Sequence, residues 1–167
     1  MLAICHSHYS LQTGVRAPGE WAKAAAQNGY SALALADING LYGAVEFAQK
    51  TMEADLKPII GTQLQLDADT ACIVLIAASH GYSQLCRLIS LYHLEPSFNL
   101  ENGIEKSGSD GLLFLSRSGD VLHRLLRLLP HDQIYALPRQ PHTDSRPAGT
   151  DNDRALWDTV PLNIPVA

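Results

Sequence analysis

Three polar side chains, His6, Asp37 and Gln63, each lie at or near the end of a short apolar run of the kind that forms a buried strand. In barrel-like α/β folds, functional side chains gather where parallel strands end. We therefore expect these three residues at one rim of a sheet, within about one side-chain layer of each other. Imidazole and carboxylate groups at such a rim can hold divalent metals that activate water. The pattern points first to metal-dependent chemistry.

A candidate metal site can be built from His6, His8 and Asp37. The two histidines stand two residues apart, so both imidazoles would face the same side of a strand, and Asp37 adds a carboxylate. Such a set could hold one divalent zinc, manganese or iron ion. The alternatives place His8 in a solvent-facing loop and use Asp37 to cap the next helix or to hold the turn at Asn39-Gly40. No serine has a Gly-x-Ser-x-Gly setting, and no catalytic residue is assigned.

Charge and composition narrow the classes of function. Lys and Arg number 12 against 17 Asp and Glu, which gives a formal charge of −5 and argues against broad phosphate-backbone binding by this chain alone. A small basic patch could still form from Arg87, Arg117, Arg124 and Arg127. The three cysteines have no zinc-binding or disulfide spacing, which favours a reducing, cytoplasmic setting. No apolar run approaches the roughly 20 residues that span a bilayer, so we expect no membrane association.

Strand-like apolar runs alternate with helical segments, which predicts an α/β fold for residues 1–167 as a single domain. Strands are expected at 1–5, 32–36, 58–66, 71–78, 112–115 and 133–137, and helices at 18–28, 41–54, 82–92 and 121–129. The continuous apolar run 71–78 is typical of a strand in a parallel sheet with both faces covered. The rest is expected as a linker at 103–111, an exposed loop at 139–153, a short helix at 154–159 and an apolar end at 164–167.

Several motifs carry a resemblance to a known family. They are His6-Ser7-His8-Tyr9-Ser10-Leu11, Ala36-Asp37-Ile38, LYGAVEF at 41–47 and KPIIG at 57–61. Together they resemble the PHP domain (polymerase and histidinol phosphatase) that begins bacterial DNA polymerase III α subunits, replicative or error-prone. The resemblance implies a distorted TIM-like (β/α)7 barrel, of which this chain supplies an incomplete N-terminal portion.

The resemblance also implies where metal ligands should stand, and there the chain departs from the family. The first imidazole of the family's His-x-His pair falls on Ile4 and the second on His6. The imidazole of Thr-Asp-His falls on Ile38, and an acidic ligand falls on Gln63. Further ligand positions fall on Thr13, on Cys72 and near 116–119. Isoleucine cannot bind a metal, and an amide is a weaker ligand than a carboxylate. We therefore expect a degenerate metal site and no cofactor.

In the resembled family, domains that keep their ligands can act as metal-dependent 3′–5′ exonucleases, and those that lost them serve structurally. The losses predict a non-catalytic, structural or docking domain of a DNA-directed DNA polymerase used in replication or error-prone synthesis. The implied partners are the remainder of the polymerase chain and a proofreading exonuclease subunit, with DNA reached only through the full-length protein.

Two alternatives and one further expectation remain open. The first alternative is a metal-dependent phosphoesterase or 3′–5′ exonuclease of the PHP superfamily, using His6, His8 and Asp37. The second is an interaction module detached from any polymerase. The apolar end at 164–167 further predicts a fragment whose open strand edge leaves it marginally stable or self-associating.

Overall fold

The computed structural model describes residues 2–11, 13–137 and 158–160. Its strands are β1 (Leu2–Cys5), β2 (Ala32–Ile38), β3 (Lys57–Gln65), β4 (Ala71–Ile76), β5 (Leu112–Ser116), β6 (Ile134–Ala136) and β7 (Asp158–Val160). Its helices are α1 (Pro18–Gln27), α2 (Ala44–Glu53), α3 (Gly81–Leu94), α4 (Leu100–Ser107) and α5 (Gly119–Leu125), followed by a 3₁₀ turn at His131–Gln133. None of the helices in these ranges is long and apolar enough to cross a membrane.

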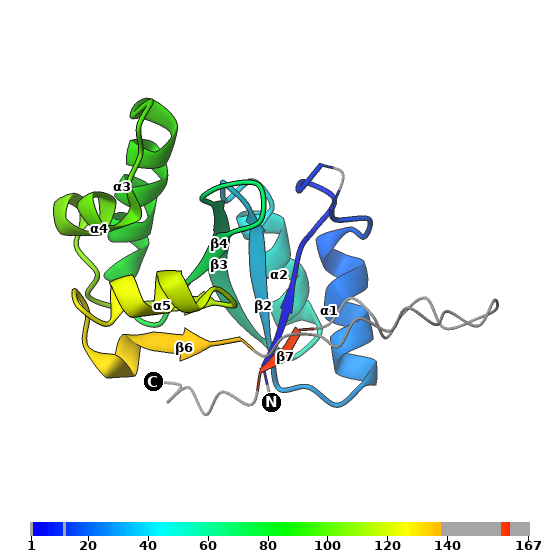
Figure 1. Cartoon of the computed structure of the whole chain (residues 1–167). Coiled ribbons are helices and arrows are strands. Elements are labelled where there is room, and N and C mark those ends of the chain that lie inside the picture. Colours follow the sequence, from blue (N-terminus) through cyan, green and yellow to red (C-terminus); the bar gives the residue numbers. More distant parts are fainter. Residues whose placement is uncertain (1, 12, 138–157, 161–167) are drawn as a thin grey trace, which may run out of the picture.

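All seven strands form one curled sheet in the order β6-β5-β4-β3-β2-β1-β7, and the helices pack around its outside (Figure 1). Strands β1, β2 and β3 run parallel, as do β5 and β6. The α/β class and the partial, barrel-like curl are therefore confirmed.

The prediction that 71–78 belongs to a parallel strand is wrong. Strand β4 is antiparallel to both β3 and β5. Only residues 66–70 separate β3 from β4, and Leu66 N–H donates to the carbonyl of Thr70 at 2.8 Å across this turn. A parallel connection needs a crossover of a dozen or more residues, so the short link forces a hairpin. The burial that favoured a parallel strand comes instead from side chains packed on both faces of β4.

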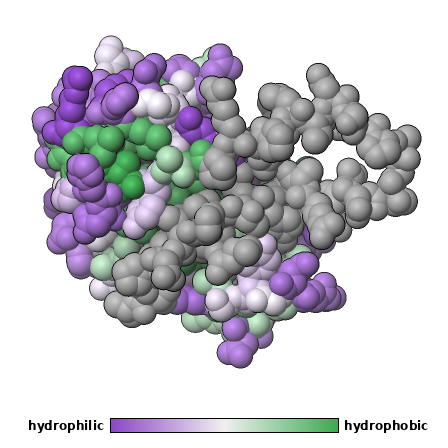
Figure 2. All heavy atoms as spheres, turned by 60° about the horizontal axis from the view of Figure 1, so that its bottom comes forward, coloured by the Kyte–Doolittle hydropathy of each residue, from purple (hydrophilic) through white to green (hydrophobic). Residues whose placement is uncertain are grey.

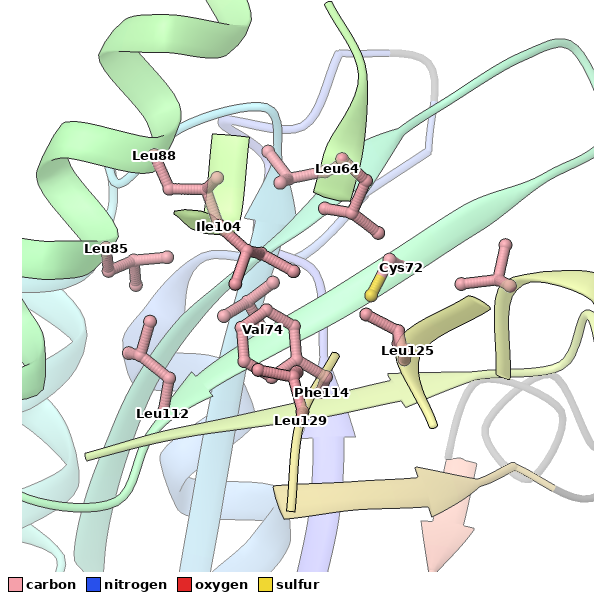
Figure 3. Close-up of a cluster of buried hydrophobic side chains, with 12 residues drawn as sticks. Leu64, Cys72, Val74, Leu85, Leu88, Ile104, Leu112, Phe114, Leu125 and Leu129 are labelled. Atoms are coloured by element: carbon pink, nitrogen blue, oxygen red, sulfur yellow. The ribbon is translucent and has the colours of Figure 1, made fainter. Parts of the chain in front are cut away.

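Helices cover the outer face of the sheet through two hydrophobic clusters. One joins β1 and β2 to α1 and α2 around Trp21 and Phe47. The other joins β3, β4 and β5 to α3, α4 and α5 around Phe114, as Figure 3 shows. A third cluster consists of strand residues and Leu137, without any helix residue, and it marks the inner face; it includes Ile4, Ala34, Ala36, Ile59, Ile73, Leu75 and Leu115.

The ends of α1 follow the sequence signals. Pro18 occupies the first turn of the helix, where its missing N–H has no cost. Gly29 follows the helix with φ at +73°, the left-handed conformation that glycine adopts most easily. The predicted start and stop of this helix are confirmed.

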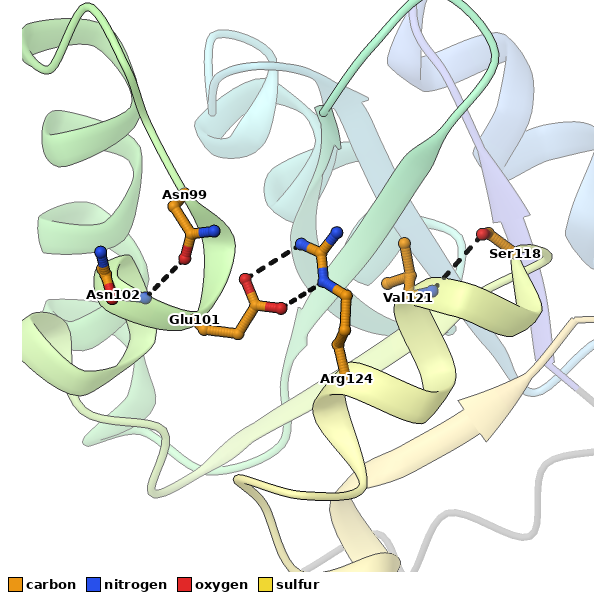
Figure 4. Close-up of polar contacts among 6 residues, drawn as sticks. All are labelled: Asn99, Glu101, Asn102, Ser118, Val121 and Arg124. Atoms are coloured by element: carbon orange, nitrogen blue, oxygen red, sulfur yellow. Dashed lines mark hydrogen bonds and ion pairs between the residues drawn. The ribbon is translucent and has the colours of Figure 1, made fainter.

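Helix α4 overlaps the segment 103–111 that the sequence predicted as a linker, and that prediction is wrong for residues 103–107. Asn99 caps the helix, because its side chain accepts from Asn102 N–H at 3.0 Å, which is drawn in Figure 4. Gly103 is required for close packing, since a Cβ there would lie 2.7 Å from Phe98 and 3.0 Å from Leu88. The glycine that suggested a linker is therefore a packing residue inside a helix.

An ion pair joins α4 to α5 across the outside of the sheet. The Glu101 carboxylate accepts from Arg124 Nε and, at 2.9 Å, from Arg124 Nη2 (Figure 4). The Arg124 guanidinium lowers the pKa of Glu101 below its usual value. This bidentate contact connects two helices that pack on neighbouring parts of the sheet.

The predicted helix at 154–159 is wrong where the structure describes it, because Asp158–Val160 form β7, antiparallel to β1. The predicted loop at 139–153 and the apolar end at 164–167 lie outside the described residues.

Figure 2 shows a hydrophobic area among hydrophilic residues on the underside of the molecule. The expectation of marginal stability or self-association stays a prediction.

Candidate functional site

The carboxylate of Asp37 is fully buried near the end of β2, and three donors from the β1–α1 loop surround it. Ser7 N–H and Ser10 Oγ each donate to Oδ1 at 2.7 Å, and Ser7 Oγ donates to Oδ2 at 2.8 Å. A buried charge is stable only when hydrogen bonds replace its hydration. Asp37 therefore ties the loop after β1 to the end of β2.

The same network holds the turn after β2, but through a different residue from the one predicted. Thr62 Oγ1 donates to the Asp37 carbonyl at 2.8 Å and accepts from Gly40 N–H at 3.0 Å. Asn39, in this turn, has a left-handed φ of 55°. The alternative in which the Asp37 side chain caps α2 or holds this turn is wrong, since α2 begins without a side-chain cap and Thr62 Oγ1 makes the contacts that hold the turn.

Gly43, the residue that precedes α2, lies directly against this network. A Cβ at Gly43 would lie 2.8 Å from Asp37 Oδ2, 3.0 Å from Ser7 Oγ and 3.0 Å from the Tyr9 ring. The backbone of α2 can therefore approach the carboxylate only because this residue has no side chain.

His6 and Gln63 meet at the edge of the sheet where β2 ends at Asp37 and Ile38, so the predicted placement of His6, Asp37 and Gln63 at one rim is confirmed, although the Asp37 side chain faces the outer side and Gln63 the inner side. His6 Nε2 lies 3.1 Å from Gln63 Oε1, and Asp37 and Ile38 pair with Thr62 and Gln63 in the β2–β3 register. Gln63 Nε2 is directed at Gln65 Oε1, 3.5 Å away. The Gln63 oxygen thus faces the imidazole, and His6 Nε2 is the donor in their contact. A metal ion at Nε2 would have to displace this proton and this bond.

The inner layer that closes the rim is almost entirely apolar. Ile38, Gln63, Ile73 and Leu115 are successive register partners across β2, β3, β4 and β5. Side chains alternate along a strand, so this row lies on the same face as the inner cluster. Gln63 is the only residue of this row with a polar side chain.

Cys72 does not contribute to this rim. It belongs to the outer cluster under the helices, and its neighbour Ile73 takes the inward position. Burial raises the pKa of the Cys72 thiol to about 12, so the sulfur stays protonated and apolar in character.

His8 lies exposed in the loop after β1, with its ring 4.4 Å from that of Tyr9. Because β1 ends at Cys5, the strand alternation that would align His6 with His8 does not apply. Within residues 2–11, 13–137 and 158–160, no three His, Cys, Asp or Glu side chains are grouped to share a metal ion. Metal binding by His6, His8 and Asp37 stays a prediction.

A pocket of about 220 Å³ opens at the same rim, between the ends of β3 and β5. Its floor includes Ile73 and Leu115, and its polar wall includes Gln63, Gln65 and residues 116–118. Ser116 Oγ donates to the carbonyl of Ala71 at 2.8 Å and accepts from Ser118 N–H at 3.1 Å. The pocket offers amides, hydroxyls, the Arg117 guanidinium and one carboxylate, that of Asp69, which can hydrogen-bond a ligand.

Ser7, Ser10 and Thr62 are the residues of this site that the sequence did not reveal. Each is a small hydroxyl residue within or just after an apolar strand, and each is buried. A buried hydroxyl needs a partner, and the β2–β3 register, which pairs Thr62 with Asp37, would have placed Thr62 there; Ser7 and Ser10 lie in the loop after β1, where no register places them.

Comparison with known proteins identifies the family. A family model described as the PHP domain matches residues 4–139. The chain belongs to the PHP domain family. The PHP match covers all residues of the Asp37 network and of the inner row.

Curated relatives of this PHP domain are DNA polymerases. The error-prone DNA polymerase of Corynebacterium diphtheriae is 32% identical over 134 residues, which are 77% of this chain and 13% of that protein. The error-prone DNA polymerase of Symbiobacterium thermophilum is 34% identical over 143 residues, 73% of this chain and 13% of that protein. That of Mycobacterium tuberculosis strain H37Rv is 37% identical over 99 residues, 53% of this chain and 9% of that protein. The chain therefore spans only a small part of the length of these relatives.

Proposed function

We propose that this chain is a non-catalytic PHP domain at the N-terminus of an error-prone type of DNA polymerase, where it serves a structural and docking role. The observation that carries the proposal is the inner row at the rim, Ile38, Gln63, Ile73 and Leu115. A multinuclear metal site needs several imidazoles and carboxylates on that face, and the row supplies one neutral amide.

The Asp37 carboxylate and the His6 imidazole, which stand at ligand positions of the resembled family, make hydrogen bonds within the protein. Asp37 accepts three hydrogen bonds from Ser7 and Ser10, and His6 donates to Gln63. Ile4, the position that corresponds to the family's first imidazole, is buried in the inner cluster. These residues do not fit a metal centre.

The intact scaffold supports a structural role. The Asp37 network orders the loop after β1 and the start of α2 without presenting a reactive group to solvent, because Ser7, Ser10 and Asp37 are all buried. The partners that we propose are the rest of a polymerase polypeptide and a proofreading exonuclease subunit, with DNA reached only through the full-length protein in the cytoplasm.

Metal analysis of the purified chain tests this proposal. Protein prepared without chelator should contain well under one zinc, manganese or iron ion per chain and should show no 3′–5′ exonuclease or phosphoesterase activity with added Mn²⁺. His6→Ala should not change either result. The alternative phosphoesterase function would be supported by stoichiometric metal that His6→Ala removes, while His123→Ala, on the exposed face of α5, retains it.

A further inference from the structure

Helix α2 and the turn before it carry a stripe of exposed, mostly apolar side chains on the side opposite to the buried face of the helix. Tyr42, Val45 and Met52 are 69%, 74% and 60% exposed, and Gln49 completes a spacing of three, four and three residues. This is the spacing of the contact positions of a helix that packs on another helix. The face of α2 that packs on the domain is a different one, formed by Ala44, Phe47 and Thr51. The helix is therefore apolar on two sides, one of them without a neighbour in the described residues.

The structure holds this stripe in place. The Tyr42 ring lies over Gly40, where a Cβ would come within 2.4 Å of the ring. Gly43, between Tyr42 and the first residue of α2, packs on the buried Asp37 network, and Phe47 N–H donates to the Gly43 carbonyl at 2.9 Å. A preordered surface loses little conformational entropy when it binds a partner.

One edge of the stripe is acidic. Glu46 and Glu53 stand seven residues apart on this edge; Glu46 accepts from Tyr9 Oη at 3.2 Å, and Glu53 pairs with Lys50 Nζ at 2.8 Å. The Lys50 stem packs against Gly19 at the start of α1, on the far side of this acidic edge from the stripe, and its Nζ offsets the charge of Glu53 but leaves Glu46 without a cation at hydrogen-bond distance among the described residues. Positions 41 and 48 on the other edge, Leu41 and Ala48, are uncharged. A partner helix therefore meets carboxylates on one side and apolar groups on the other.

We propose that the stripe formed by Tyr42, Val45, Gln49 and Met52 is a docking surface for an amphipathic helix whose apolar stripe is flanked by Lys or Arg. The inference rests on the docking role proposed above and names its surface and the chemistry of its partner. Cations beside the partner's apolar stripe would pair with Glu46 and Glu53, as flanking charges do in helix pairs. A second copy of this chain is disfavoured, because a two-fold contact through α2 brings the same acidic edge toward itself.

Two synthetic three-heptad peptides test the proposal. Both carry Leu at the contact positions; one has Lys and the other Glu at the flanking positions. Fluorescence anisotropy with the 167-residue chain should show binding of the Lys peptide at least about tenfold tighter than that of the Glu peptide. The difference should shrink in high salt, which screens exposed charges. The double variant Val45→Ser, Met52→Ser should bind the Lys peptide about tenfold more weakly or worse. Glu46→Gln with Glu53→Gln should remove the preference for Lys.

Matched controls separate this surface from general stickiness. Tyr82→Ser and Leu94→Ser remove exposed apolar side chains on α3 and should leave the affinity within about twofold, as expected for residues outside the contact. Thermal melts of every variant verify folding. Equal affinity for the two peptides would overturn the proposal, as would full binding by the Val45→Ser, Met52→Ser variant. Self-association that this variant abolishes would assign the stripe to a second copy instead. These readouts are independent of the metal content that tests the proposed function.

Discussion

The two faces of the rim differ sharply in how their polar positions are used. On the outer side, the Asp37 carboxylate is buried with donors from Ser7 and Ser10. On the inner side, the row across β2–β5 keeps only the Gln63 amide among apolar neighbours. The inner row of β2–β5 therefore offers a single neutral amide, whereas the outer network is built into the fold.

The physical reason for this difference is the cost of burial. Replacing a metal ligand by isoleucine on the inner face leaves an apolar side chain in an apolar cluster, which is favourable. Removing the Asp37 carboxylate leaves two hydroxyls and an N–H without an acceptor in a buried site, which is unfavourable. The stability of the fold thus depends on one half of the rim, and metal chemistry would depend on the other.

The largest effect that we expect is from Asp37→Ala. It leaves the donors of Ser7 and Ser10 unsatisfied in a buried site, and it should lower the free energy of unfolding by about 3 kcal/mol or more. Urea denaturation measures this change. Asp69→Ala, at an exposed position in the β3–β4 turn, is the control and should change stability little. A loss of unfolding free energy in Asp37→Ala no larger than that in Asp69→Ala would contradict the structural role of the network.

A smaller effect is expected from Gly43→Ala. The new methyl group would press on Asp37 Oδ2 and Ser7 Oγ, and overpacking of this kind costs about 1–3 kcal/mol. Gly119→Ala is a matched control, since a Cβ there meets nothing within 4 Å and alanine favours the helical conformation of α5. Thermal unfolding should show a lower melting temperature for Gly43→Ala and an unchanged or higher one for Gly119→Ala. Equal melting temperatures for both variants would show that α2 can move away from Asp37.

The smallest effect is expected away from the rim, from Glu101→Gln. Arg124 lowers the pKa of Glu101, so the ion pair contributes stability above the usual carboxyl pKa. That contribution is lost as the pH falls through the lowered pKa of the folded state. The variant should be less stable by about 0.5 kcal/mol near neutral pH, because the pair is partly exposed. The difference should vanish at acid pH. Glu105→Gln, an exposed control on α4, should show no such pH dependence in urea titrations. The same pH profile in both variants would contradict a stabilising role of the Glu101–Arg124 ion pair.

Local signals in the sequence predicted most of the elements. Pro18 and Gly29 fixed the ends of α1, and the apolar runs placed β2, β3 and β5. Where a signal was ambiguous, packing decided: Gly103 looked like a linker residue but allows α4 to approach Phe98. The length of the 66–70 turn, which was overlooked, would have revealed the antiparallel direction of β4.

The candidate site depends on strand register, which the sequence does not state. The convergence of His6, Asp37 and Gln63 followed from their positions near strand ends. The partners of Asp37 did not, because Ser7 and Ser10 come from a loop whose path is set by the carboxylate itself. The inner position of Ile73 rather than Cys72 depends on the register of the β3–β4 hairpin.

We propose that the inner rim holds no metal because of the side chains at Ile4, Ile38 and Gln63. Calorimetric titration with Zn²⁺ and Mn²⁺ tests it on the natural chain and on a variant that combines Ile4→His, Ile38→His and Gln63→Glu. The natural chain should show no stoichiometric binding. The variant, whose thermal melt verifies folding, should gain at least one site. One tightly bound ion per natural chain, lost on His6→Ala, would contradict this proposal.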